Sequence, residues 1–311
     1  MKQGNWKGHL ALGLAYTIFG INLVTSKDIA NADAVTPIAL FTMRAVGATA
    51  LFWLISLFLP KEKVPARDMG KIVIASVLGL FIPQFTFLKA VTMATPIDIG
   101  VVGTLSPIFT LFIAYFALKE PITLKKIGGV LLSLCGILFL IYNSVHAHND
   151  VEATTPAGYA LLVANGLSFS AYLGIFRPLI QKYKVITFMK WMFLSALLIS
   201  LPLSAGKLML TDFSVITTEV WLEIGFLILF ATFVCYFLIP FGQKSIRPTI
   251  VSMYAYLQPI IAAIFSIWTG MDSLTWQKIL AIIFVFGGVA LVNRSRAAQS
   301  RQNRGNLLRR L

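Results

Sequence analysis

Three ionisable side chains stand inside long apolar stretches of the sequence, where a charge is costly and indicates a function by default. Arg44 lies seven residues after Pro37, about 10 Å along a helix that rises 1.5 Å per residue. Its guanidinium could bind the carboxylate of a substrate, while Asp98 or Glu223 could bind an ammonium group. A structural ion pair between Arg44 and one of these acids is an equally good interpretation.

Neutral polar and aromatic residues in the apolar stretches are further candidates for substrate contact. Amide groups can hydrogen-bond a zwitterion, and aromatic rings can line an apolar pocket. For each such residue, ordinary packing is at least as good an interpretation. Asn22 and Gln258 are the strongest candidates, one for its place in the first apolar stretch and the other because it precedes Pro259. The predicted substrate-binding residues are Asn22, Arg44, Gln84, Asp98, Tyr172, Trp191, Tyr254 and Gln258.

The sequence lacks the residue sets of common membrane enzymes. It contains no Ser/His/Asp set, no H-E-x-x-H and no phosphate-binding glycine loop, so we expect no enzymatic activity, no catalytic residue and no cofactor. The segment with His146, His148, Asp150 and Glu152 could bind a metal, but a solvated loop explains it better, and no metal site is predicted. Because an ATP-binding motif is also absent, gradients must drive any transport.

The composition indicates which elements position the polar residues. Of the 311 residues, 58% are hydrophobic and 12% are charged, about half the charged share of a soluble domain. Apolar windows of about 20 residues, long enough to cross a bilayer, predict ten membrane-spanning helices in one all-α bundle. Their approximate cores are residues 7–26, 37–59, 70–89, 95–117, 124–142, 156–176, 185–204, 219–240, 249–269 and 275–293.

The basic residues predict the orientation of these helices. The chain has 26 Lys and Arg against 12 Asp and Glu. With ten spans both termini share a side, and most of the basic residues fall there, so the positive-inside rule places both termini in the cytoplasm and the protein in the plasma (inner) membrane. In this topology Arg44, Asp98 and Glu223 all lie in the outer half. The basic tail is expected to face phospholipids rather than nucleic acid.

The sequence repeats itself at a spacing of 152 residues. Residues 103–123, GTLSPIFTLFIAYFALKEPIT, align without a gap with residues 255–275, AYLQPIIAAIFSIWTGMDSLT. The alignment predicts two repeats of five spans, residues 1–150 and 151–295, followed by the tail 296–311. Because five is odd, the second repeat must enter the membrane from the opposite side. Inverted repeats of this kind give the geometry of alternating access.

Pro107 and Pro259 occupy matched positions in the fourth and ninth predicted spans. A proline inside a helix removes a hydrogen bond and clashes with the preceding turn, so both are predicted to kink their helices and to take part in gating. Backbone groups freed at this depth need cover from protein or a wet cavity, which favours a central pathway. A bend that serves packing alone is the alternative.

Other matched residues predict packing rather than chemistry. Glu120 and Asp272 are interpreted as turn and helix-start residues, because acids favour helix N-termini. Small residues share one face in each of the fifth and tenth spans and permit close helix contact; they are Gly129, Ser133 and Gly136 in the fifth and Ala281 and Gly288 in the tenth.

The segment P-I-F-T-L-F-I-A-Y-F-A-L-K-E-P-I-T-L-K-K-I-G-G-V-L-L-S-L-C-G-I, its fainter second copy and F-G-I-N at residues 19–22 resemble the EamA family of the drug/metabolite transporter superfamily. The resemblance covers nearly the whole chain and agrees with the arrangement of five plus five spans. It implies a bacterial inner-membrane exporter of amino acids or other small metabolites. Phe19 stands where many members have Trp, and Tyr172 lies near the position that corresponds to Asn22.

We therefore predict a secondary transporter that exports amino acids or related small metabolites by alternating access. A carrier of nucleotide-linked or lipid-linked sugars, or of cationic drugs, with the same fold is the alternative. The expected partners are a small-molecule substrate and the lipid bilayer, with no nucleic acid. The duplication supplies both repeats in one chain, which favours a monomer and leaves a dimer open.

Overall fold

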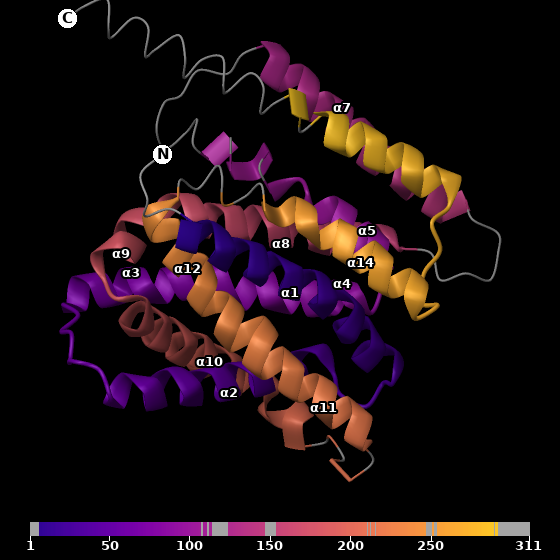
Figure 1. Ribbon diagram of the computed structural model, residues 1–311. Coiled ribbons are helices and arrows are strands. Elements are labelled where there is room, and N and C mark those ends of the chain that lie inside the picture. Colours follow the sequence, from indigo (N-terminus) through magenta and orange to yellow (C-terminus); the bar gives the residue numbers. More distant parts are fainter. Residues whose placement is uncertain are drawn as a thin grey trace, which may run out of the picture.

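The computed structural model describes residues 6–106, 108–110, 112–113, 124–146, 154–209, 211, 213–214, 216–246, 251, 254–288 and 290–291. Over these residues the chain is all-helical and contains no β-strand (Figure 1). Some features predicted from the sequence lie outside the described residues; they are the kink at Pro107, the turn at Glu120, the polar residues His148, Asp150 and Glu152, and the tail 296–311.

Six of the described helices are long and apolar enough to cross a membrane, which confirms a multi-pass membrane protein. They are α1 (Trp6–Asn31), α2 (Pro37–Leu57), the continuous helix Ala66–Val91, α8 (Pro156–Ile175), α10 (Val185–Met209) and the continuous helix Thr218–Ser245. Shorter apolar helices lie where the sequence predicts the other spans, at Pro96–Thr110, Ile127–Gly136, Tyr254–Trp268 and Trp276–Gly288.

Threonine followed by proline begins three of the helices. α2, α5 (Pro96–Gly103) and α8 each have Thr at the N-cap and Pro at the first helical position. Proline fits this position because its missing N–H would have no intrahelical partner there. The side chains of Thr95 and Thr155 also accept hydrogen bonds from the N–H groups of Asp98 and Gly158, which caps α5 and α8.

The two long helices Ala66–Val91 and Thr218–Ser245 each contain a π-helical segment. In the first, η1 (Val77–Phe81) joins α3 (Ala66–Ser76) to α4 (Ile82–Val91); in the second, η2 (Leu227–Val234) joins α11 (Thr218–Phe226) to α12 (Cys235–Ser245). A shift of 152 residues places η1 within η2. In a π-helical segment, backbone carbonyls are available to accept hydrogen bonds from side chains. The Leu78 carbonyl in η1, for example, accepts a hydrogen bond from the Ser168 hydroxyl at 2.8 Å.

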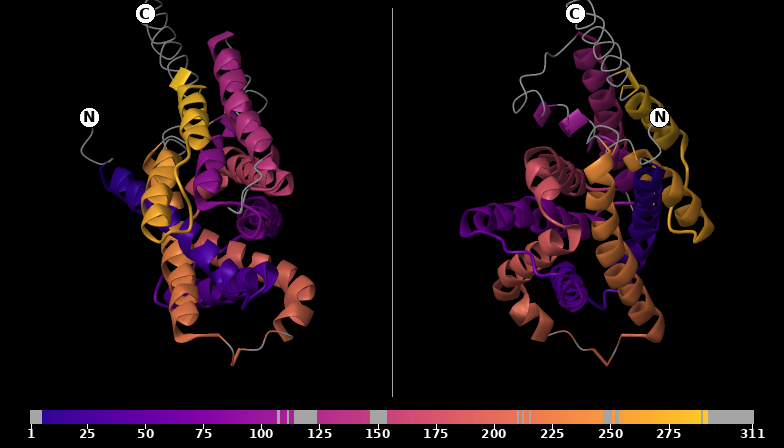
Figure 2. Two further views of the ribbon diagram at one scale, coloured as in Figure 1. Left: turned by 90° about the vertical axis from the view of Figure 1, so that its right-hand side faces the viewer. Right: turned by 60° about the vertical axis from the view of Figure 1, so that its left-hand side comes forward.

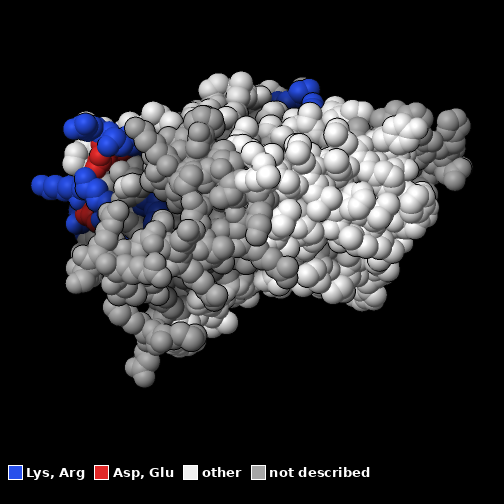
Figure 3. Space-filling model, turned by 90° about the horizontal axis from the view of Figure 1, so that it is seen from above, with Lys and Arg blue, Asp and Glu red and all other residues white. Residues whose placement is uncertain are grey.

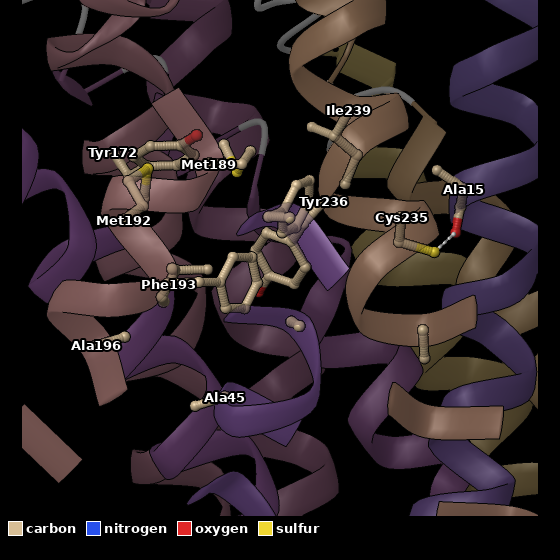
Figure 4. Packing of buried hydrophobic residues seen from close by; sticks show 14 of the residues in the cluster. Ala15, Ala45, Tyr172, Met189, Met192, Phe193, Ala196, Cys235, Tyr236 and Ile239 are labelled. Atoms are coloured by element: carbon tan, nitrogen blue, oxygen red, sulfur yellow. Dashed lines mark hydrogen bonds between the residues drawn. The ribbon is translucent and has the colours of Figure 1, made fainter. Parts of the chain in front are cut away.

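The hydrophobic core forms where α2 packs on α10, α4 packs on α8, and α1 packs on both α12 and α14 (Leu257–Trp268). In Figure 4 the rings of Phe193 and Tyr236 point toward each other, edge to face, with centroids 5.5 Å apart. The Cys235 thiol points to α1 and donates to the Ala15 carbonyl at 3.3 Å. The ring of Phe52 in α2 also stacks on that of Phe193, with centroids 5.3 Å apart, so aromatic contacts connect helices from both halves of the sequence.

The helix α7 (Leu124–His146) and the helix Trp276–Gly288 lie side by side, away from the rest of the bundle (Figures 1 and 2). Their small residues meet, which confirms the predicted close contact. The Ser133 hydroxyl donates to the Val285 carbonyl at 3.1 Å. A methyl group at Gly136 would lie 3.0 Å from the Ala281 carbonyl oxygen, so only a residue without a side chain fits there without a shift.

The substitution Gly288→Ala is expected to destabilise this helix pair, because the new methyl group would collide with the backbone of Gly129 and Ser133. Overpacking of this kind costs about 1–3 kcal/mol, so the thermal melting midpoint in detergent should fall. Gly225→Ala is the matched control, since no heavy atom lies within 4 Å of its added methyl group. Equal melting midpoints for Gly288→Ala and the unchanged protein would contradict the described packing.

Candidate functional site

A cavity lies among α1, α2, α4, α5, α8, α12 and α14. The volume of the cavity that the centres of water-sized molecules can occupy is about 110 Å³. Because one buried water needs about 10–15 Å³ by this measure, the cavity has room for several waters or a small solute. Its polar lining consists of Asn22, Arg44, Gln84, Ser106, Asn165 and Gln258. Its aromatic lining consists of Tyr16, Phe19, Phe87, Phe169 and Tyr236.

Arg44 is the cationic residue of this lining and is 2% exposed. Its Nε donates a hydrogen bond to the Thr232 hydroxyl in η2 at 2.8 Å, and that hydroxyl donates to the Leu227 carbonyl at 2.7 Å. The π segment therefore holds the acceptor that orients the guanidinium. The buried Nη1 of Arg44 has no hydrogen-bond partner in the described part of the chain, so it can donate to a bound molecule.

Neither of the acids that the sequence offers as an ammonium site lines the cavity. Asp98 is buried, and its Oδ2 accepts from the Thr154 hydroxyl at 2.6 Å and from the Tyr159 hydroxyl at 3.0 Å. Glu223 lies beside Asp28. Among the described residues, no ion pair joins Arg44 to Asp98 or to Glu223, so the guanidinium stays free to bind an anion.

The amide side chains predicted to contact substrate lie in the cavity wall. Gln84 is 5% exposed, and neither atom of its amide group has a hydrogen-bond partner within the described chain. Asn22 accepts a hydrogen bond from the Ser26 hydroxyl at 3.4 Å. Gln258 lies close to Gly103 across the cavity wall. The structure thus brings together Asn22, Arg44, Gln84 and Gln258, and their contact with substrate remains a prediction.

Four other predicted substrate-binding residues do not line the cavity. These four are Asp98 and three aromatic residues that pack against other side chains, Tyr172, Trp191 and Tyr254. Tyr172 is buried, and its ring covers Gly79 so closely that a methyl group there would lie 2.5 Å from it. Trp191 packs edge to face on Trp53, with centroids 5.2 Å apart. The Tyr254 hydroxyl is 2.7 Å from the His9 ring nitrogen Nδ1.

Pro259 lies in the first turn of α14, directly after the 3₁₀ turn η3 (Tyr254–Tyr256). Its missing N–H is unproblematic there, because the first turn of a helix has no intrahelical acceptors. The helix is therefore interrupted at η3, before Pro259, and not at the proline where the sequence predicts a kink. In the first half of the chain α5 ends at Gly103, 152 residues before Ala255. A methyl group at Gly100 would lie 2.7 Å from the Pro259 Cα, so α5 and α14 cross closely here.

Two residues important to the site were not predicted from the sequence. Thr232 positions Arg44, and Tyr236 lines the cavity. The repeat contains a signal for Tyr236, because this residue lies 152 residues after Gln84. Ser106 and Gln258 form a second pair of lining residues with the same spacing. The two halves of the sequence therefore contribute matched positions to one cavity.

Comparison with known proteins identifies the family. The model of the EamA-like transporter family matches residues 6–142 and again residues 156–294. The chain belongs to this family. A membrane transporter is therefore supported, in agreement with the multi-pass helices and the central cavity.

Individual relatives of this EamA-like protein are distant but cover most of its length. The uncharacterized transporter YetK of Bacillus subtilis is 22% identical over 90% of this chain and 85% of its own. A chain from Chlamydia muridarum named S-adenosylmethionine/S-adenosylhomocysteine transporter is 25% identical over 84% of each chain. A protein of known crystal structure has a TM-score of 0.64 and 18% identity, covering 93% of this chain and 98% of its own. That likeness shows the shared fold.

The hydrogen bond between Thr232 and Arg44 is expected to stabilise the fold. Thr232→Val keeps the shape of the side chain but leaves Nε of the buried guanidinium without an acceptor, which should cost about 2 kcal/mol. The melting midpoint in detergent should fall, whereas Thr232→Ser, which keeps the hydroxyl, should melt within a few degrees of the unchanged protein. If the valine variant melts no lower than the serine variant, this hydrogen bond does not hold Arg44.

Proposed function

We propose that this protein is a secondary transporter that exports small carboxylate-bearing metabolites, amino acids among them, by alternating access. The observation that carries the proposal is the buried Arg44 guanidinium, which lines the cavity with its Nη1 unpartnered among the described residues. A planar guanidinium binds carboxylates with good geometry, and charge-assisted hydrogen bonds of this kind are strong when water is excluded.

The rest of the lining supports a substrate with both polar and apolar parts. Buried amides such as Gln84 can hydrogen-bond polar groups, while the rings of Phe19, Phe87 and Phe169 offer an apolar surface. The relative from Chlamydia muridarum is named as a carrier of S-adenosylmethionine and S-adenosylhomocysteine, which are both amino acids with a carboxylate. An amino-acid-like substrate is consistent with these observations.

Alternating access requires two packings of similar energy, which inverted repeats provide. We propose ten membrane helices in two such repeats, residues 1–150 and 151–295. Three observations support this arrangement: the family matches the chain twice, the π segments η1 and η2 occur at matched positions, and the cavity is lined by matched pairs such as Gln84 and Tyr236. Rocking of the repeats would open the cavity to each side in turn.

The distribution of charge supports a cytoplasmic location for both termini and a plasma membrane location. Figure 3 shows Lys, Arg, Asp and Glu gathered at one end of the visible face and one further group of Lys or Arg at its upper edge, while the rest of the described surface in this view is uncharged. This end includes the start of α3 and α9 (Arg177–Lys182), where Lys182 and Lys71 lie 2.5 Å and 3.8 Å from the Asp68 carboxylate. Hydrogen bonding to Asp68 raises the pKa of Lys182 above its ordinary value, so this ammonium stays charged.

Counterflow in proteoliposomes tests the proposed function. Vesicles loaded with a mixture of amino acids should take up at least one labelled amino acid in a saturable exchange. Arg44→Ala should reduce that exchange about tenfold or more, because a hydrogen bond to a charged group contributes about 1.5–3 kcal/mol and 1.4 kcal/mol is a factor of ten. Lys190→Ala is the control, since this cation lies over the Trp53 ring and does not line the cavity.

Two results would contradict the proposal. A well-folded unchanged protein that exchanges no amino acid would move sugars, lipids or cations ahead as substrates. Exchange that Arg44→Ala leaves intact would show that the guanidinium does not bind the substrate.

A further inference from the structure

A second group of charged side chains lies outside the cavity, where α5 begins and where α14 connects to the helix Trp276–Gly288. Lys278 donates to the Asp272 carboxylate at 2.5 Å and to the Thr95 hydroxyl at 3.2 Å. The other oxygen of Asp272 accepts from the N–H of Ile97 in the first turn of α5, at 3.2 Å. The side chains of Lys278 and Asp272 are only 13% and 0% exposed, so this ion pair is shielded from water.

Asp98 belongs to the same group and brings a second carboxylate to it. Its Oδ2 accepts the two hydroxyl hydrogen bonds from Thr154 and Tyr159. Its Oδ1 is buried and has no hydrogen-bond partner among the described residues. Within the described part of the chain, the titratable groups that face it are Lys278 in the last described helix, Asp272 in the connection before that helix, and Tyr159 in α8. The helix α14, which packs on α5, carries no titratable side chain.

The charges in this group do not balance. Two carboxylates share one ammonium, and Lys278 is hydrogen-bonded to Asp272, so Asp98 is the surplus acid. A buried carboxylate with an oxygen that lacks a donor is costly, and binding a proton removes its charge. The described residues contain no group of three or more His, Cys, Asp or Glu that could hold a metal ion. A proton neutralises the Asp98 carboxylate without needing any further ligand.

The position of Asp98 connects this group to the cavity. Ile99, the next residue of α5, lines the cavity, and so does Gly103 one turn further on. On the other side, Thr154 and Tyr159 tie Asp98 to the start of α8. Opening this end of the bundle would separate these elements and expose the carboxyl group to water, and water in the cavity would approach it along α5.

We propose that Asp98 is a proton-binding site that couples proton movement to transport. Its Oδ1 takes a proton from water on one side of the membrane, which forms the O–H bond, and returns it to water on the other side, which breaks that bond. The carboxyl group is protonated while this end is closed and is ionised when the end opens. This inference rests on the proposed transport function, since a protein that does not alternate would not carry the proton across.

Infrared spectroscopy tests proton binding without any substrate. The purified Glu223→Gln protein in lipid, a background that removes the second carboxyl pair formed by Glu223 and Asp28, should show the C=O stretch of a buried protonated carboxyl group on titration with acid and base, and adding Asp98→Asn should remove that band. Tyr159→Phe removes one hydrogen bond to the ionised form and should move the midpoint of the band to higher pH by about one unit. If the band is absent from the Glu223→Gln background, or persists there when a folded protein also carries Asp98→Asn, the proposal is wrong.

Transport under a pH gradient tests coupling. Proteoliposomes that exchange a labelled amino acid at equal pH should accumulate it several-fold more when a pH gradient of the driving sign is imposed, and Asp98→Asn should reduce this ratio to one. Asp33→Asn, at an exposed acid between α1 and α2, is the matched control and should keep the ratio. Exchange that ignores the gradient in the unchanged protein would overturn coupling while leaving the transport function intact, whereas no exchange at all would overturn both.

Discussion

A guanidinium removed from water inside a membrane protein costs several kcal/mol unless its N–H groups find acceptors. Arg44 meets this requirement in part, because the Thr232 hydroxyl accepts from Nε while the buried Nη1 has no partner among the described residues. The hydroxyl is held by the π turn of η2, whose geometry leaves the Leu227 carbonyl within reach. Long helices with π interruptions, packed around a cavity, thus keep one charged donor ready for an anion.

Polar groups at both ends of the bundle complement this central charge. At one end Asp68 accepts hydrogen bonds from Lys182 and Tyr183, and these contacts join α3 to α9 and the residue that follows it. At the other end Asp98 and Asp272 connect the starts of α5 and α8 with the last helix. In the alternating access that we propose, such contacts hold an end closed and break when it opens, while the apolar core stays packed.

The positions of the helices were predictable because the cost of placing a residue in lipid depends on its own side chain, and the apolar stretches coincide with described helices. The same cost of placing a polar side chain in lipid predicted that Arg44 and Gln84 lie in a polar site, and both line the cavity. The face that each helix points toward the cavity was not predictable, because the packing of the helices decides it. Asp98, predicted to bind substrate, faces α8 instead of the cavity. The π segments also escaped prediction, because their pattern of apolar residues does not differ from that of an α-helix.

The most direct test of the central claim, that the cavity is a pathway reached alternately from both sides, is the labelling of Ser106→Cys. This residue lines the cavity, and the variant is made with Cys135 and Cys235 replaced by Ser and Ala. A membrane-impermeant thiol reagent should label the new cysteine both in cells and in inverted vesicles, and substrate should slow both reactions. Labelling from one face only, in a variant that still exchanges substrate, would contradict alternating access through this cavity.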